Sequence, residues 1–169
     1  ISVGGLPDGI VDTDMLAANA VTAAKRGAGA ILQVQYGFRT SHLQTDSSSY
    51  VDTGITANIT PLSTSNKILI QMCVLHGMYY SSNVDVISQV RILRGVGGTD
   101  TEIFTERTAD YMRGKVDSNW LIAGQYLLHQ DSPSTTSATT YKLQIRKGST
   151  NGTVSVWAGS GVVLQEVAA

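Results

Sequence analysis

The chain has 169 residues and a mass of 17.9 kDa, which is the length of a single domain. It carries 12 basic and 13 acidic residues, for a net charge of -1, and only 15% of its residues are charged, against roughly 25% in an ordinary globular domain. The balanced charge excludes a nucleic-acid-binding protein, and the absence of an apolar run of about 20 residues excludes a membrane-spanning segment. The 42% hydrophobic content excludes intrinsic disorder.

Residues 1–30 differ from the rest of the chain, because alanine is dense there and aromatic residues are absent. Their apolar positions are too few to be buried by the segment itself, so it needs partners, and further copies of the chain are the obvious ones. We expect a short stem that forms a homotrimer or anchors the chain, and residues 12–26 fit a helix, a strand or a wrapped coil. The chain begins at Ile1 rather than Met, which indicates a processed chain or a fragment. The candidate trimerisation residues are Ile10, Val11, Met15, Leu16 and Val21.

From residue 31 onward the pattern is almost entirely that of strands, with eight or nine short strands separated by turn residues. This spacing predicts an all-β head domain over residues 31–169, built as a jelly-roll-like antiparallel β-sandwich. The expected strands are 31–43, 50–59, 67–80, 84–93 with a bulge near Ser88, 101–105, 119–130, 141–146, 153–158 and 161–167.

Three details of these strands are predicted from local pattern. The single Cys73 lies in an apolar run, and we expect a small buried side chain there. Asn151 and Gly152 carry the signal of a tight hairpin turn. In the strand 119–130 we expect the inward positions to be Trp120, Ile122, Tyr126 and Leu128.

Motifs for catalysis, cofactors or metals are not found in the sequence. The glycine-rich stretch 95–98 lacks the last glycine of a dinucleotide fingerprint, and His42, His76 and His129 have no paired spacing. The acidic residues of the middle third lie alongside basic ones, and this balance of charge is typical of a solvated loop region. We therefore expect no enzyme activity, no cofactor and no bound metal.

Exposed aromatic side chains beside planar polar groups are suited to sugars, because a pyranose face stacks on a ring while its hydroxyls bond the polar groups. The alternative is that these rings pack in the core or between subunits. The candidate receptor-binding residues are Tyr79, Tyr80, Asp110, Tyr111, Arg113 and Asn119.

Several segments resemble bacteriophage tail-fibre-like virion proteins at the junction between shaft and head. The residues 5–9, 16–25 and 29–34 resemble shaft repeats that run into "Gly-Ala-Ile-Leu-Gln-Val", although Arg26 and Gly27 replace the usual Leu-Ala after Lys25. Residues 48–55 and 59–70 resemble the family's "Ser-Phe-Val-Asp-Thr-Gly-Leu" and "Ile-Thr-Pro-x-Ser-x-x-Ser-Lys-Ile-Leu-Ile", and residues 164–167 resemble its last strand. Residues 76–140 show no such match.

The resemblance implies a structural role in the virion: a trimeric tail-fibre or tailspike head that attaches the particle to a glycan or protein receptor on the host. Its expected partners are copies of itself, other virion proteins through the N-terminal segment, and the host surface. It would be made in the bacterial cytoplasm and reside on a tail fibre or the capsid surface. The alternatives are a trimeric capsid decoration or head-fibre protein, a monomeric carbohydrate-binding module and an embedded depolymerase.

Overall fold

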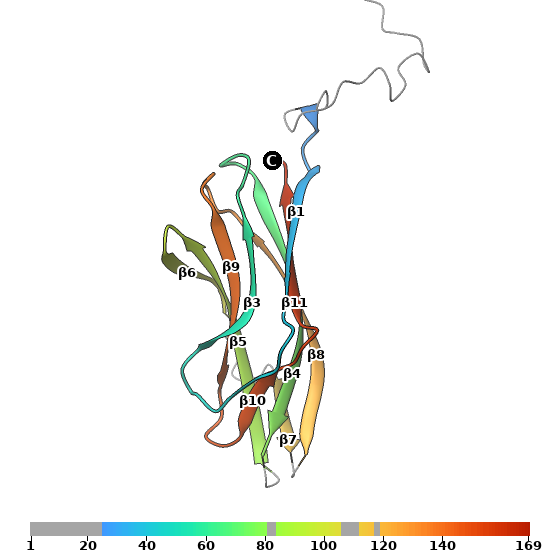
Figure 1. The fold of residues 1–169 in the computed structure, drawn as a ribbon, viewed down its shortest axis with the longest axis vertical. Coiled ribbons are helices and arrows are strands. Elements are labelled where there is room, and N and C mark those ends of the chain that lie inside the picture. Colours follow the sequence, from blue (N-terminus) through green and yellow to red (C-terminus); the bar gives the residue numbers. More distant parts are fainter. Residues whose placement is uncertain (1–24, 81–83, 106–111, 117–118) are drawn as a thin grey trace, which may run out of the picture.

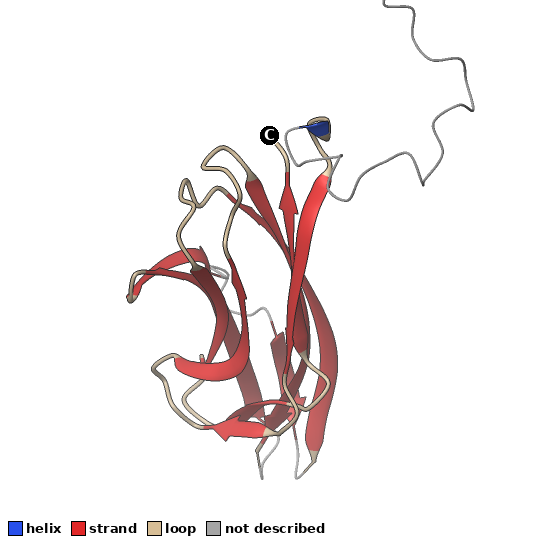
Figure 2. Cartoon of the chain, turned by 45° about the horizontal axis from the view of Figure 1, so that its top comes forward, coloured by secondary structure: helices blue, strands red, loops and turns tan. Residues whose placement is uncertain are grey.

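The computed structural model describes residues 25–80, 84–105, 112–116 and 119–169. Two antiparallel sheets face each other as a sandwich (Figure 1), and the described residues include no α-helix. Strands make up most of the described chain (Figure 2), so the prediction of an all-β antiparallel sandwich is confirmed. The strands are β1 (Ile31–Phe38), β2 (Leu43–Thr45), β3 (Val51–Ile59), β4 (Lys67–Tyr79), β5 (Val84–Val96), β6 (Thr99–Thr105), β7 (Met112–Val116), β8 (Trp120–Asp131), β9 (Thr139–Lys147), β10 (Thr153–Val156) and β11 (Gly161–Val167).

The first sheet, here called sheet A, is organised around the long strand β4. One side of β4 pairs with β8 along its whole length, and the other side pairs first with β11 and then with β10. Beyond these two, β1 pairs with β11 and β2 pairs with β10. β8 and β1 are therefore the two edges of the sheet over the half where β4 pairs with β11.

The second sheet, sheet B, has the order β3-β9-β5-β6, and β7 pairs with the first part of β5. β5 is its central strand, since it pairs with β9 on one side and with β6 and β7 in turn on the other. Figure 1 shows β6 projecting at the outer edge of this layer.

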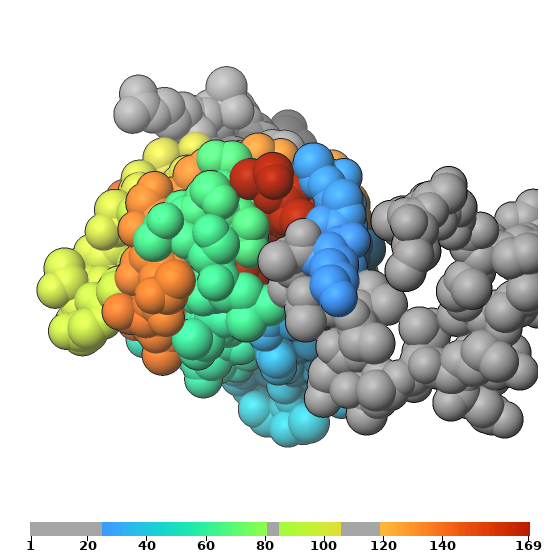
Figure 3. All heavy atoms as spheres, turned by 90° about the horizontal axis from the view of Figure 1, so that it is seen from above, coloured from blue at the N-terminus to red at the C-terminus, as the bar shows by residue number. Residues whose placement is uncertain are grey.

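The two ends of the sandwich are distinct. At the upper end in Figure 1, β1 begins next to the end of β11, and the Gly29 amide donates to the Ala168 carbonyl at 2.9 Å. Seen from above, residues of β1 lie beside the C-terminal residues (Figure 3). At the lower end, β4 ends at Tyr79 and β8 begins at Trp120, which are register partners. The segment that precedes residue 25 thus joins the sandwich at the end opposite Tyr79.

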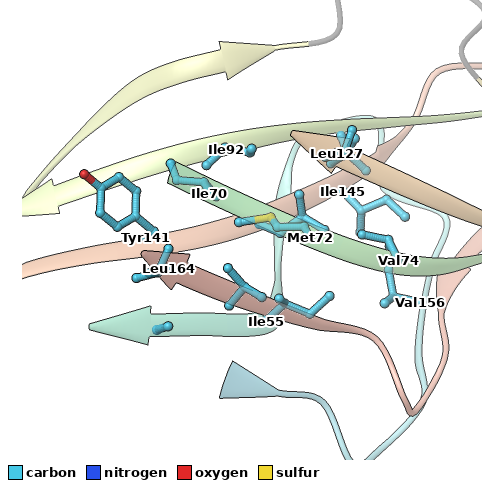
Figure 4. Packing of buried hydrophobic residues seen from close by; sticks show 14 of the residues in the cluster. Ile55, Ile70, Met72, Val74, Ile92, Leu127, Tyr141, Ile145, Val156 and Leu164 are labelled. Carbon is cyan, nitrogen blue, oxygen red and sulfur yellow. The ribbon is translucent and has the colours of Figure 1, made fainter. Parts of the chain in front are cut away.

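The core forms where the inner faces of the two sheets meet. In β3, Ile55, Ala57 and Ile59 are buried and alternate with exposed residues, which is the period of a strand with one covered face. Figure 4 shows such side chains from β3, β5 and β9 pointing toward those of β4, β8 and β11. Among them, Tyr141 is fully buried and donates a hydrogen bond to Asp131 at 2.6 Å.

Most predicted strands occur close to their expected bounds, with three differences. The expected strand 31–43 is two strands in one sheet, β1 and β2, separated by residues 39–42. The bulge expected near Ser88 is absent from the pairing of β5, whose register shifts instead between Ile92 and Leu93. The structure also places a short strand, β7, that the sequence pattern did not indicate.

The predicted facing of β8 is wrong. Gln125 and Leu127 point inward and are buried, whereas Ile122, Tyr126 and Leu128 are exposed on the outer face of sheet A. Alternation shows which residues share a face, but not which face is covered, and we had assigned the more apolar side to the core.

The prediction that Cys73 is buried is also wrong, because its thiol is exposed. Met72 and Val74 take the inward positions of β4, so Cys73 between them must face outward. An apolar run does not reveal this, since every residue in it has the same character.

The Asn151–Gly152 turn does not close a hairpin. β9 lies in sheet B and β10 in sheet A, so this turn carries the chain from one layer to the other. Gly152 has a φ of 90°, a conformation that asparagine and glycine adopt most readily, which explains the turn signal.

The candidate trimerisation residues of the N-terminal segment lie outside the described residues. Their role, and the division into a stem of residues 1–30 and a head of residues 31–169, stay predictions. The residues concerned are Ile10, Val11, Met15, Leu16 and Val21.

Candidate functional site at the lower end of the sandwich

Three of the predicted receptor-binding residues come together at the lower end. Tyr79 closes β4, Tyr80 follows it, and Asn119 immediately precedes Trp120, the register partner of Tyr79. The arrangement follows from the antiparallel pairing of β4 and β8, which places the end of one strand beside the start of the other. Asn119 is exposed, and both tyrosines are half-buried.

Of the other three candidates, Arg113 alone belongs to a strand that the structure describes. Arg113 lies in β7, where its backbone pairs with Ile87 of sheet B. Asp110 and Tyr111 lie outside the described residues. The receptor-binding role of all six residues stays a prediction.

An open hollow of about 370 Å³ adjoins the two tyrosines. It takes its polar lining from elements far apart in sequence: Asp46 follows β2, Lys147 ends β9, and Thr150 and Asn151 belong to the turn between the sheets. Local sequence reasoning missed these residues, because only the crossing of the chain between the layers brings them to Tyr79. Their one sequence signal was the Asn-Gly turn.

Four ring-bearing side chains continue from Tyr79 across the outer face of sheet A. The ring of Tyr79 lies 5.4 Å from that of Trp120, which meets Trp157 edge-on at 5.8 Å. His42 stacks on Trp157 with a ring separation of 4.2 Å. These four residues are called the lower aromatic cluster.

Gly77 makes room for this cluster. A Cβ atom at position 77 would lie within 3.0 Å of Ser155 Oγ, Trp157 Nε1 and the Trp120 ring. The two indoles can therefore approach the backbone of β4 only because this residue has no side chain. The buried Ser155 Oγ and Trp157 Nε1 make no hydrogen bond to the described residues.

The lower end thus combines rings with amide, hydroxyl, ammonium and carboxylate groups. Half-buried rings give a surface for stacking, and the polar groups of the hollow can bond hydroxyls. Asp46 is the single carboxylate that lines the described hollow.

The outer face of sheet B has a different character, with polar side chains bonded across the strands. Gln144 Nε2 donates to Asp52 at 2.7 Å, and Arg91 Nε donates to Gln144 Oε1 at 2.7 Å. Arg91 also pairs with Glu102 at 3.0 Å and lies over the ring of Tyr50. Lys142 pairs with Asp100 at 2.6 Å, and this hydrogen bond raises the pKa of Lys142. These groups satisfy one another, and they form a solvated surface.

Two buried carboxylates tie segments together in the upper part of the sandwich. Glu166 is fully buried and accepts hydrogen bonds from Asn66 Nδ2 at 2.6 Å, the Leu62 amide at 2.7 Å and Gln33 Nε2 at 2.5 Å. Asp131 of sheet A accepts from Arg94 and Tyr141 of sheet B. Burial, followed by the Asp131 carboxylate, raises the pKa of Tyr141 far above its usual range, so the phenol stays protonated as a donor.

A buried histidine lies nearer the lower end. His76 of β4 is fully buried with its Nδ1 3.0 Å from Ser88 Oγ of β5. Burial lowers the pKa of its imidazole to about 4, because the charged ring would lose its hydration. His76 is therefore neutral near pH 7.

Among the described residues, no three His, Cys, Asp or Glu side chains are grouped so that they could hold a metal ion. A search of the same residues for a helix long and apolar enough to cross a membrane finds none.

Comparison with known proteins gives distant structural neighbours. No family model and no curated protein sequence matches the chain. Among solved structures, it is similar to a chain of infectious bursal disease virus, Gt strain, with a TM-score of 0.42 and 13% identity over 81% of this chain and 38% of the viral one. The VP2 subviral particle of the same virus gives a TM-score of 0.41 and 12% identity over 80% and 37% of the two chains. The CBM22-1 xylan-binding domain from Paenibacillus barcinonensis gives a TM-score of 0.34 and 11% identity over 85% and 99%.

This chain spans less than two fifths of the length of the viral chains it matches. At these TM-scores and identities, the neighbours assign neither a family nor an activity to it.

Proposed function

We propose that this chain is the head of a trimeric virion fibre that attaches a phage particle to a glycan on the bacterial surface. The observation that carries the proposal is the opposition of the two ends. Residues 25–30 enter at the upper end beside the C-terminus, and Tyr79, Tyr80 and Asn119 lie at the lower end. A fibre head needs this polarity, with its attachment to the particle at one end and its binding surface at the other. The resemblance of residues 5–34 to a shaft-to-head junction supports the same orientation.

The lower end supports the choice of a glycan as the receptor. The tyrosines stand beside a hollow lined by Asp46, Lys147 and Asn151, so stacking and hydroxyl bonding are both available. Each head would bind weakly, and three heads on one stem would bind the same surface jointly. The proposed role is binding without catalysis.

Binding of the intact chain to immobilised bacterial surface polysaccharides tests the proposal. Tyr79→Ala and Asn151→Ala should each weaken binding about tenfold or more, since each removes a contact worth about 1.4 kcal/mol. Matched controls are Tyr50→Ala and Asn58→Ala, which change the same residue types on the outer face of sheet B. If all four variants bind as the unchanged chain does, the glycan site is not at the lower end.

Two further measurements separate the alternatives to a tail-fibre head. Release of reducing sugar from the bound polysaccharide would show a depolymerase, and we expect none. Antibody-gold labelling of intact particles should place the protein on the tail, whereas label spread over the shell would show a capsid decoration protein.

The predicted role of the N-terminal stem in trimerisation is tested in the full chain by the double substitution Met15→Asp with Leu16→Asp. If these residues hold the trimer, the mass measured by light scattering should fall from three times 17.9 kDa toward one.

A further inference from the structure

The outer face of sheet A is apolar although it faces solvent in the single chain. Large side chains from the edge strands β1 and β8 stand on it. They are exposed by 50% at Ile31, 49% at Val34, 69% at Tyr36, 62% at Phe38, 50% at Ile122, 59% at Tyr126 and 59% at Leu128. Isolated exposed hydrophobic residues are common, but a contiguous group of this size marks a covered surface.

Strand pairing shows that the group is continuous across the sheet. One row runs from Tyr36 through Val163 and Gln71 to Leu128, and the next from Phe38 through Gly161 and Cys73 to Tyr126. Four strands spaced by about 4.8 Å make each row roughly 15 Å wide. Neither row contains a charged side chain.

The distribution of residues in β8 indicates that the apolar character of this outer face has a function. Its inward side carries the buried amide of Gln125, whereas its outward side carries Ile122, Tyr126 and Leu128. A strand whose outer side faced only water would have the opposite pattern. The outer face of sheet B has that ordinary pattern, with Asp52, Gln144, Arg91 and Glu102 bonded across it.

The size of the face matches an interface between proteins. If a large apolar side chain presents roughly 200 Å², the seven exposed fractions amount to about 800 Å². That is the area that each partner buries in an interface of standard size, and it exceeds the largest apolar patch of a typical monomer, about 300–600 Å².

We propose that the outer face of sheet A packs against a second copy of this chain, so that the heads as well as the stems hold the fibre together. The two rows are neutral, so they meet the same rows of a second copy without like-charge repulsion. Its edge strand β1 is also the strand into which the N-terminal segment runs, so stems gathered about an axis bring β1 of each copy close to that axis. This inference rests on the proposed trimer and names the surface that completes it.

The exposed thiol of Cys73 reports on the face, because it lies in one of the two rows and is the one cysteine of the chain. The experiment uses the full chain and measures two quantities: the mass by light scattering, and the rate at which Cys73 reacts with the thiol reagent DTNB. We expect a mass of three times 17.9 kDa and a reaction at least tenfold slower than in the unfolded chain.

Tyr126→Lys with Leu128→Lys places two charges on the face. This variant should give a smaller assembly with a fast-reacting Cys73 while its thermal unfolding transition is retained. The matched control is Leu62→Lys, since Leu62 is 57% exposed on the loop between β3 and β4 and belongs to neither row. The control should keep both the mass and the slow reaction. If the double variant does not fold, Tyr36→Lys on the opposite edge of the sheet replaces it. The mass and the reaction rate of Cys73 in the unchanged chain test the inference even if neither variant folds.

Three results overturn the inference, and each is recognisable. A trimeric mass with a fast-reacting Cys73 means that the stems alone join the copies, which leaves the proposed trimer intact. A single-chain mass with a slow-reacting Cys73 means that the chain's own N-terminal segment covers the face. A single-chain mass with a fast-reacting Cys73 removes the trimer as well, while the polysaccharide-binding measurement still decides the receptor role.

Discussion

Two buried polar residues, Glu166 and His76, make the stability of this sandwich depend on hydrogen bonding and on charge state. Both side chains lie in the interior, but their surroundings differ. Glu166 accepts hydrogen bonds from three donors, one in β1 and two in the loop between β3 and β4, whereas His76 has Ser88 as its neighbour and is kept neutral by burial. A buried polar group stabilises a fold only while its partners and its charge state are maintained.

The stability of the head should fall as the pH is lowered from about 6.5 to about 4. The folded state holds His76 neutral with a pKa near 4, while the unfolded chain binds a proton near pH 6.5. The unfolded state therefore binds more protons within this window, and about 3 kcal/mol is lost across it. Urea unfolding at several pH values measures the slope. His76→Gln should flatten it.

Glu166→Gln should lower the free energy of unfolding by about 2–3 kcal/mol. Both carboxylate oxygens accept hydrogen bonds, and an amide would turn one NH₂ group toward a donor. The control is Glu102→Gln, whose side chain is 40% exposed, and it should cost less than about 1 kcal/mol. Equal losses in the two variants, measured by urea unfolding, would contradict the role given to Glu166.

At the scale of strands, β4 determines the shape of sheet A. Its thirteen residues pair with β8 on one side, and with β11 and β10 in succession on the other. At its lower part, Gly77 lets Trp120 and Trp157 lie over the backbone, so the lower aromatic cluster depends on one missing side chain.

Gly77→Ala should displace the lower aromatic cluster. The new methyl group would have to push Ser155 Oγ and Trp157 aside, because it would lie closer to both than real contacts allow. We expect a changed near-ultraviolet circular dichroism spectrum and a lower melting temperature. Gly124→Ala on the neighbouring strand is the control, since the nearest atom is Leu75 Cδ2 at 3.8 Å, and neither readout should change there.

How far the sequence predicts the strands depends on how different their two faces are. In β3, Ile55, Ala57 and Ile59 alternate with exposed residues, and these three apolar side chains form its buried side. In β8 the outer side is the more apolar one, so alternation identified the two sets of residues but assigned the wrong set to the core. The proposed interface would account for this pattern, because both faces of β8 would then be covered.

Some residues of the candidate site could be predicted from the sequence, and others could not. Tyr79 and Tyr80 could be found from sequence, because they end a long apolar strand and their residue type fits sugars. Asp46 and Lys147 could not, because their position beside the tyrosines depends on the order of strands in two sheets. Local pattern contains no information on that order.

On the scale of the whole molecule, the two outer faces differ in a way that assigns them separate roles. The outer face of sheet B carries charged side chains bonded to one another, and the outer face of sheet A carries large apolar ones. One therefore suits contact with water and the other contact with protein.

The assembled state should be insensitive to salt. The proposed interface rows contain no charged residue, so raising NaCl from about 50 mM to about 1 M screens nothing within them. Light scattering should give the same mass at both concentrations, and ammonium sulfate should strengthen the assembly because it favours apolar burial. Dissociation at high NaCl would show that ion pairs hold the copies together.

The position of β1 also has a mechanical consequence. If the lower end is anchored to a cell while the stem is pulled, the tension enters the head through Ile31 and runs along β1. β1 is paired with β11 from Ile31 to Phe38, and antiparallel hydrogen bonds lie perpendicular to their strands. The pull would therefore shear all of these bonds at once instead of unzipping them one after another, and the joint between stem and head would resist the drag on an attached particle.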